Sequence, residues 1–204
     1  MDISGMDLKY IGDSIISSQH CQRNWDLSKE MPQEHIDLLV QAATQCPSKQ
    51  NLAHYKLHVI TNREIIKKIY PDCRDKRNMI RTNPQVLANL LFIFEQLIHT
   101  TPMYEEGTTN PTLLLKRDKD MSIGIASGYV ALVANMLGYR TGFCACLQQN
   151  SIMETLGMTN RPQLLLGVGY YQSNLMYNVG PNIYAKNVDF STHVKEPIDV
   201  NFIK

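Results

Sequence analysis

One long apolar segment limits the folds open to this chain more than any other feature. Residues 121–139, MSIGIASGYVALVANMLGY, have helical spacing and carry small residues on more than one helical face. Because small side chains let other backbones approach closely, we expect this helix to be buried, at the centre of a domain or at a subunit interface. Gly138 is well suited to end the helix.

Weaker patterns on both sides of this segment predict a sheet covered by helices. The predicted helices are 7–18, 32–46, 62–70 and 151–157, and the predicted strands are 55–61, 87–96, 141–147 and 163–171. Residues 97–118 lack periodicity, which predicts a long loop or lid. Helices first, and then strands alternating with helices, indicate an α+β, or α/β layered, fold.

The chain has the composition of one globular domain. Of its 204 residues, 44% are hydrophobic and 19% are charged, which argues against a disordered chain. Since there is no repeat and no linker, we expect a single domain over residues 1–204, with a C-terminal extension from about 172 to 204. This extension has weak periodicity and is expected to wrap around the body of the protein.

Net charge and hydropathy exclude several classes of function. The formal net charge is +1, which is too small to attract nucleic acid or an anionic membrane. No apolar run is long enough to cross a bilayer, and the first residues lack the apolar core of a signal peptide. We therefore expect a cytoplasmic protein whose five cysteines are reduced.

Generic cofactor and catalytic motifs are missing, and the cysteine pair at 144–146 does not replace them. The sequence contains no P-loop, no dinucleotide fingerprint, no esterase elbow and no HExxH metal motif. Cys144-Ala145-Cys146 lacks the further ligands of a zinc site and the two-residue spacing usual for a redox pair. We interpret both thiols as small apolar side chains, with a metal or thiol-redox protein as the alternative.

Two polar segments and the segment that follows Gly138 carry the functional signal. Residues 19–25, QHCQRNW, follow the first helix and offer His20, Cys21 and Arg23. Charged donors grouped in this way suit a phosphate, because ionised hydrogen bonds are strong. Residues 46–55, CPSKQNLAHY, lead from a helix to a strand through a polar loop.

In their order and spacing these segments resemble the flavin-dependent nitroreductase family, from about residue 8 to about residue 171. That family has an Arg-Arg/His-Ser-x-Arg/Lys-x-Phe motif after its first helix, which residues 19–25 match, and an Ala-Pro-Ser-x-x-Asn-x-Gln-Pro-Trp motif, which residues 46–55 match. Its buried helix ends in Leu-Gly, as at Leu137-Gly138. The resemblance implies a central, mostly antiparallel β-sheet flanked by helices, in a domain-swapped homodimer with two FMN molecules at the interface.

The resemblance also implies which residues bind FMN. The phosphate and ribityl chain would be held by His20, Cys21 and Arg23, and the phosphate site would be completed by Lys186. The other subunit would line the ring and ribityl chain with Pro47, Ser48 and Asn51. The pyrimidine edge of the flavin would face Asn83 and Gln85, and flavin N5 would face a backbone N–H of Ala145 or Cys146.

The implied activity is that of an FMN-dependent oxidoreductase. Hydride would pass from NAD(P)H through flavin N5 to a small acceptor such as a nitroaromatic or quinone, in ping-pong order and with no catalytic side chain. Residues 97–118 lie where the substrate lid varies among members of the family, so Tyr104, Glu105 and Glu106 are candidate substrate contacts. A solvated loop without substrate contacts is the favoured interpretation of this segment.

This chain departs from the family pattern at two positions of the first motif. Gln19 replaces the usual Arg and removes one charge from the phosphate site, and Cys21 replaces Ser, which is the better hydrogen-bond donor. These departures leave open a specialised flavin enzyme on the same scaffold, such as a reductive dehalogenase or a flavin-fragmenting enzyme. They also leave open a flavin-binding protein with little turnover.

Overall fold

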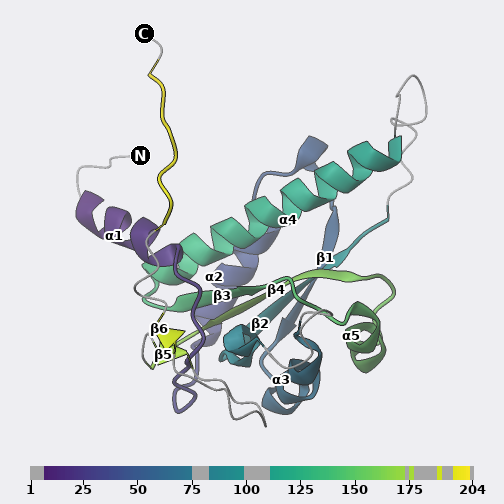
Figure 1. Ribbon diagram of the computed structural model, residues 1–204, viewed down its shortest axis with the longest axis horizontal. Helices are drawn as coiled ribbons and strands as arrows, with labels where there is room; N and C mark the ends of the chain where they lie inside the picture. The colour runs from purple at the N-terminus through teal and green to yellow at the C-terminus, as the bar shows by residue number, and fades with distance from the viewer. Residues whose placement is uncertain are drawn as a thin grey trace.

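The computed structural model describes residues 7–74, 83–98, 111–172, 175–176, 188–189 and 195–202. Its centre is a four-stranded sheet (Figure 1) in the order β1 (Tyr55–Ile60), β2 (Leu90–Gln96), β4 (Pro162–Gly169), β3 (Arg140–Cys144). All three strand pairs are antiparallel. The mostly antiparallel sheet expected from the family resemblance is therefore confirmed.

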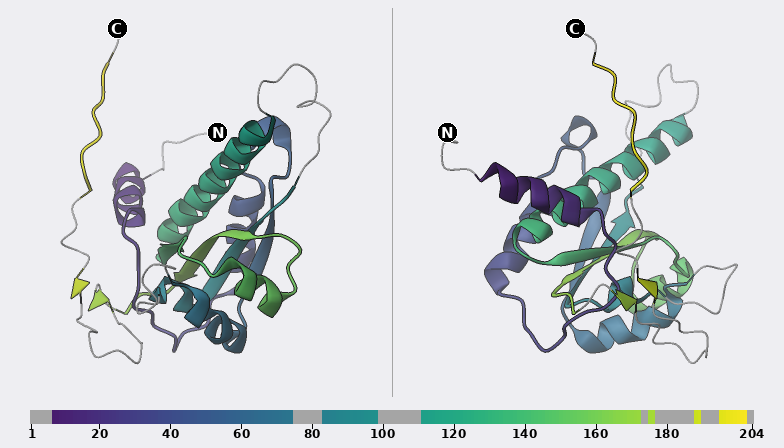
Figure 2. Two further views of the ribbon diagram at one scale, coloured as in Figure 1. Left: turned by 45° about the vertical axis from the view of Figure 1, so that its right-hand side comes forward. Right: turned by 60° about the vertical axis from the view of Figure 1, so that its left-hand side comes forward.

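Helices cover both faces of this sheet. On one face lie α4 (Pro111–Met136) and α2 (Gln33–Thr44), and α1 (Leu8–Ser18) packs against α4. The other face carries α3 (Arg63–Ile69) and α5 (Gln149–Leu156), as the two views of Figure 2 show. The result is a layered α+β fold with the sheet in the middle.

The central strands β2 and β4 have no polar face because both of their faces are covered. Along β2, Leu90, Phe92 and Phe94 belong to the core under α2 and α4, whereas Leu91 and Ile93 belong to the core under α3 and α5. All five of these side chains are fully buried. This packing explains why the sequence of β2 is a continuous apolar run rather than an alternating one.

Helix α4 is longer than the sequence predicts, and the prediction of a loop over 97–118 is wrong for residues 111–118. The helix begins at Pro111, ahead of the apolar stretch. Proline is favoured in the first turn of a helix, and the residues after it are adequate helix formers, so nothing local stops the helix. Its end agrees better with the prediction, since Gly138 has a positive φ of 84° and Tyr139 N–H donates to Ala134 O at 2.9 Å.

Strand β2 begins later than predicted because residues 84–87 form a 3₁₀ turn, η3 (Pro84–Leu87). This turn lies directly on the sheet, over two glycines. A Cβ at Gly142 would lie 2.8 Å from the Gln85 Cβ, and one at Gly167 would lie 2.0 Å from Gln85 O. Only glycine permits this contact, so Gly142 and Gly167 determine how close η3 comes to the strands.

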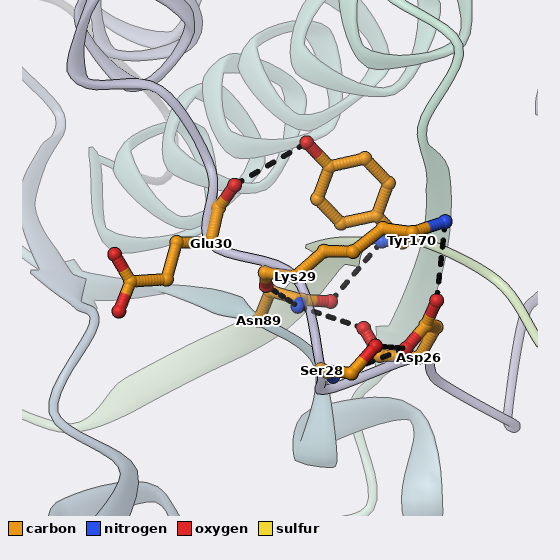
Figure 3. Close-up of polar contacts among 6 residues, drawn as sticks. All are labelled: Asp26, Ser28, Lys29, Glu30, Asn89 and Tyr170. Atoms are coloured by element: carbon orange, nitrogen blue, oxygen red, sulfur yellow. Dashed lines mark hydrogen bonds and ion pairs between the residues drawn. The ribbon is translucent and has the colours of Figure 1, made fainter.

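The segment after the first motif is clamped to the sheet by Asn89 (Figure 3). The Asn89 amide donates to Asp26 O at 3.0 Å and to Lys29 O at 2.9 Å, and its Oδ1 accepts from Tyr170 N–H at 3.1 Å. The Tyr170 hydroxyl donates to Glu30 O at 3.3 Å. Residues 26–30 are thereby fixed at both ends.

Beyond β4, the described residues add little to the core. Strands β5 (Leu175–Met176) and β6 (Val188–Asp189) form a short antiparallel pair. Residues 195–202 are extended and exposed, and they lead away from the sheet in Figures 1 and 2. Among the described helices, none has both the length and the apolar character that crossing a bilayer requires.

Candidate functional site

The first motif lies against the edge strand β3. Cys21 forms a parallel β-bridge with Thr141, and Gln22 N–H donates to Thr141 O at 2.7 Å. The Cys21 thiol lies 3.5 Å from Phe143 O, and the Trp25 indole donates to Pro84 O at 2.9 Å. Residues 21–25 therefore pass between β3 and η3, anchored by backbone and side-chain hydrogen bonds.

The turn η3 brings the predicted pyrimidine-edge residues to the same place. The Gln85 side chain lies close enough to the Cys21 thiol to lower its pKa in part, and the Asn83 amide, which donates to Cys73 O at 3.0 Å, acts on the Cys144 thiol in the same way. The Oε1 atom of Gln85 is buried and has no partner among the described residues. A buried carbonyl oxygen without a donor is costly, so this position suits a ligand that supplies an N–H.

The segment after β3 exposes its backbone and buries one of its two thiols. Cys144 is 3% exposed, whereas Ala145 and Cys146 lie at the surface. The Cys73 thiol donates to Ile69 O at 3.4 Å and the Cys144 thiol to Cys146 O at 3.7 Å, and the closeness of the two thiols lowers the pKa of Cys144 and raises the pKa of Cys73. Residues 145–146, where the flavin contact is predicted, are thus exposed, while the Cys144 side chain is buried in the core.

Arg23 provides the positive charge near these groups. Its guanidinium Nη1 donates to Cys21 O at 2.7 Å, and its charge acts on both the Cys21 and the Cys144 thiols. Burial raises the pKa of Cys21 more than the Arg23 charge lowers it. Cys21 is therefore a neutral thiol at pH 7 and offers no positive charge to a phosphate.

The second motif lies far from this cluster within one chain. It includes η1 (Lys49–Asn51) and ends at the start of β1, where Tyr55 pairs with Gln96 at one end of the sheet. The first motif borders the opposite edge strand, near Thr141 at the other end. The two motifs are separated by three strand spacings across the sheet and by about six residues along the strands. This corresponds to a distance on the order of 20 Å.

The second motif also has strained backbone. Gln50 and Asn51 have φ values of 55° and 54°, in the left-handed region that residues other than glycine seldom adopt. Pro47 and Asn51 are exposed and Ser48 is half-buried. Strain held in an exposed loop points to a functional constraint.

The structure therefore brings three of the predicted segments together and leaves one apart. The group that converges, here named the β3-edge cluster, consists of His20, Cys21, Arg23, Asn83, Gln85, Ala145 and Cys146. The loop with Pro47, Ser48 and Asn51 is separate from it. Lys186 and the candidate lid residues Tyr104, Glu105 and Glu106 lie outside the described residues.

Sequence reasoning missed the residues that hold the cluster in place. Asn89 does so indirectly, since it fixes residues 26–30 directly after the first motif, and a polar residue inside a predicted buried strand was the available signal. Gly142 and Gly167 are others, since their need for close backbone contact appears only in three dimensions. Within the described ranges, no group of three His, Cys, Asp or Glu side chains is placed to hold a metal ion.

The donor set of the β3-edge cluster fits FMN. A flat ring with an imide N–H would satisfy the Gln85 Oε1 atom, and the exposed peptide at 145–146 offers an N–H to a ring nitrogen. Arg23 offers positive charge to the anionic end of the cofactor.

Comparison with known proteins adds a family and a set of similar folds. The family model described as Nitroreductase family matches residues 16–170, well over half of the chain. No curated protein sequence matches the chain significantly.

Several solved structures share the fold at low sequence identity. One is a nitroreductase-type protein from Exiguobacterium sibiricum crystallised with FMN: identity is 21%, 79% of this chain and 88% of that chain are covered, and the TM-score is 0.64. Another is a protein from Staphylococcus epidermidis described as an NAD(P)H:FMN oxidoreductase: identity is 15%, coverage is 94% and 95%, and the TM-score is 0.68. A third, from Clostridium acetobutylicum and described as an NADH oxidase, is 21% identical with coverage of 78% and 88% and a TM-score of 0.58. At such identities the likeness shows the fold alone.

Proposed function

The chain belongs to the nitroreductase family, and on that premise we propose that it is an FMN-dependent NAD(P)H oxidoreductase whose acceptor is a small organic molecule such as a nitroaromatic or a quinone. The supporting observation is the β3-edge cluster, where a buried carbonyl without a donor, a guanidinium and an exposed peptide converge. When bound, FMN would supply the chemistry, accepting two electrons from the nicotinamide and passing them to the acceptor.

The residues of the chain would bind and orient the cofactor rather than transfer protons. Gln85 Oε1 would accept an N–H from the pyrimidine edge, with Asn83 beside it. A peptide N–H at Ala145 or Cys146 would donate to the ring. His20, Cys21 and Arg23 would hold the ribityl phosphate, and Lys186 stays a predicted contact of the same group.

We propose that the site is completed by a second copy of the chain. Since Pro47, Ser48 and Asn51 lie on the order of 20 Å from the β3-edge cluster, they contribute to a common site only if a partner supplies them. A homodimer places two equivalent sites at one interface, because residues that meet across a twofold axis do so twice.

An uncovered apolar face supports the homodimer. On α4, Met121 is 57% exposed and Tyr129 is 46% exposed, and no described atom outside the helix's own backbone lies within 4 Å of the Cβ positions of Gly124 and Gly128. On the extended tail, the exposed apolar residues are Ile198, Val200 and Phe202. An apolar helix face and an apolar tail of this kind are typical of an interface with exchanged segments.

The visible absorbance of the purified protein tests flavin binding directly. We expect a yellow protein whose flavin bands bleach on addition of NADPH or NADH and return on addition of a quinone or a nitroaromatic. A colourless protein that gains no bound flavin with added FMN would refute the proposal. A protein that binds FMN but is not reduced would be a flavin-binding protein with little turnover, and turnover of halogenated phenols alone would identify a dehalogenase.

Mixing two inactive variants tests the shared site. Arg23→Ala and Asn51→Ala each damage both sites of a homodimer. After subunit exchange at equal amounts, half of the dimers are mixed, and each mixed dimer has one intact site, so about a quarter of the FMN sites should recover. If both residues acted within one chain, mixing would restore nothing.

A further inference from the structure

A cavity next to the β3-edge cluster is lined by positively charged side chains without an acidic side chain among its described lining residues. Its volume is about 420 Å³, and residues from four segments line it, among them Arg23, Trp25, Arg63, Lys67, Tyr70 and Leu87. Three of these are cations, and no aspartate or glutamate lines the cavity among the residues that the structure describes. The volume falls in the range of small-molecule sites.

Arg63 is the best-oriented of the three cations. Its Nη1 donates to Leu87 O at 2.7 Å and to Ala88 O at 3.0 Å, which fixes the guanidinium. Lys67 is paired with Glu64 at 2.9 Å, whereas Arg63 has no salt bridge to a described residue. Burial lowers the pKa of Arg63, and the charge of Glu64 offsets only part of this effect.

A guanidinium that is partly buried and has no salt bridge to a described residue favours the binding of an anion. Removing a charge from water is costly unless the charge is paired, and an arginine stays protonated at any ordinary pH. Two carbonyls fix one end of the Arg63 fork, so its remaining N–H groups are preorganised for a planar anion such as a carboxylate. Less side-chain entropy is then lost on binding.

The rest of the cavity is apolar and partly aromatic. Trp25 is 7% exposed and is held by its hydrogen bond to Pro84 O, and Tyr70 and Leu87 face the same space. Aromatic walls favour a flat ring as the ligand, because rings stack and bury large areas at small entropic cost. The ligand that matches both features is a ring bearing one carboxylate.

One wall of the cavity is rigid. Leu27 lines both this cavity and a neighbouring one of about 660 Å³, which also contains Arg63 and Lys67. The segment that carries Leu27 is the one clamped by Asn89 and Tyr170 (Figure 3). This wall of the cavity is therefore held in place before a ligand arrives.

We propose that the cavity lined by Trp25 and Arg63 is a second binding site, separate from the flavin, for a planar aromatic monocarboxylate whose anion pairs with the Arg63 guanidinium. The carboxylate replaces the missing counterion, and the ring lies against Trp25 and Tyr70. Arg23 lines the same cavity and belongs to the β3-edge cluster, so the two sites are neighbours.

The single tryptophan of the chain makes this testable, since Trp25 is in the cavity wall. The probe is 2-naphthoate, titrated into FMN-saturated protein by calorimetry and by Trp25 fluorescence, with uncharged 2-naphthamide as the matched ligand. We expect naphthoate to bind at least tenfold more tightly than the amide and to change Trp25 emission without releasing FMN. Equal affinity for acid and amide, or displacement of FMN, would overturn the proposal.

Variants separate the role of Arg63 from general effects of charge. Arg63→Gln should weaken naphthoate at least tenfold and leave naphthamide unchanged, whereas Lys68→Gln, on the same helix but outside both cavities, should change neither. Because Arg63→Gln loses two backbone contacts, Lys67→Gln serves as a second variant, with an expected loss of two- to fivefold. Unaltered naphthoate binding in folded Arg63→Gln would refute the site. If Arg63→Gln does not fold, unaltered naphthoate binding in Lys67→Gln would refute it. Inorganic phosphate binding as tightly as naphthoate would refute the aromatic part.

Discussion

Replacing Gly167 by alanine tests whether the contact between η3 and the sheet is as close as the structure shows. The added Cβ would lie 2.0 Å from Gln85 O and 2.9 Å from the Ala88 Cβ. A carbon and a carbonyl oxygen normally approach to about 3.3 Å, so η3 or β4 must shift by about 1.3 Å. The Gln85 carbonyl is backbone and the Ala88 Cβ is fixed to the backbone, so no change of rotamer relieves the contact.

The expected cost of Gly167→Ala is about 3 kcal/mol of unfolding free energy, at the upper end of the range for overpacking. For a chain of this size the melting temperature should fall by roughly 6–12 °C. Because η3 carries Gln85, FMN binding should weaken as well. Urea unfolding followed by circular dichroism, at one protein concentration and without FMN, measures the first effect, and flavin titration measures the second.

The matched control is Gly12→Ala in α1, where nothing lies within 4 Å of the added Cβ. Alanine is a better helix former than glycine, so this variant should be more stable by about 0.5–1 kcal/mol. The reasoning about η3 is refuted if Gly167→Ala unfolds within about 0.5 kcal/mol of the unchanged protein. A loss of equal size in the Gly12→Ala control would also refute it.

Three further substitutions test other parts of the structure. Glu95→Gln should cost about 3 kcal/mol near pH 7, because the buried Glu95 carboxylate bonds to His58 at 2.6 Å and to Asn160 N–H at 2.7 Å. Burial raises the pKa of Glu95, but these hydrogen bonds more than offset that effect and hold the pKa below its ordinary value. The stability that the Glu95 carboxylate contributes is therefore fully present above about pH 4.3, the value in an unfolded chain. It is lost as the pH falls through the lowered pKa of the folded protein. Urea unfolding at pH 7 and below pH 4 should therefore show a gap between variant and unchanged protein that narrows only in acid, and a constant gap would contradict this account. Asn62→Ala should cost about 1 kcal/mol in thermal unfolding, since the Asn62 side chain caps α3 by accepting from Glu64 N–H and Ile65 N–H; no loss would show that the cap is dispensable. Cys146→Ala should keep the flavin absorbance of the protein, because the predicted contact uses the peptide N–H and not the sulfur, whereas loss of bound flavin would assign the contact to the thiol.

The predictions that succeeded from sequence rest on local physics. The cap at Asn62, the end of the long helix near Gly138 and the apolar strand β2 follow from hydrogen bonds and periodicities that a few neighbouring residues determine. The start of α4 at Pro111 was missed because the three leucines of its first turns, at 113–115, are consecutive and not at helical spacing, although nothing in these turns opposes a helix. The order of the matched motifs was sufficient to identify the family.

The site depended on information that no local pattern contains. Cys21, Gln85 and Cys146 are far apart along the chain, and they converge because β3 pairs with β4 and η3 lies on Gly142 and Gly167. The role proposed for Arg63 depends on the fold, which half-buries its guanidinium in a cavity that no described acid lines. Sequence by itself therefore determined the elements and the family, since these depend on short-range order and spacing. Tertiary structure decided which side chains meet and which charges stay unbalanced, because burial and strand pairing join residues that are distant in sequence.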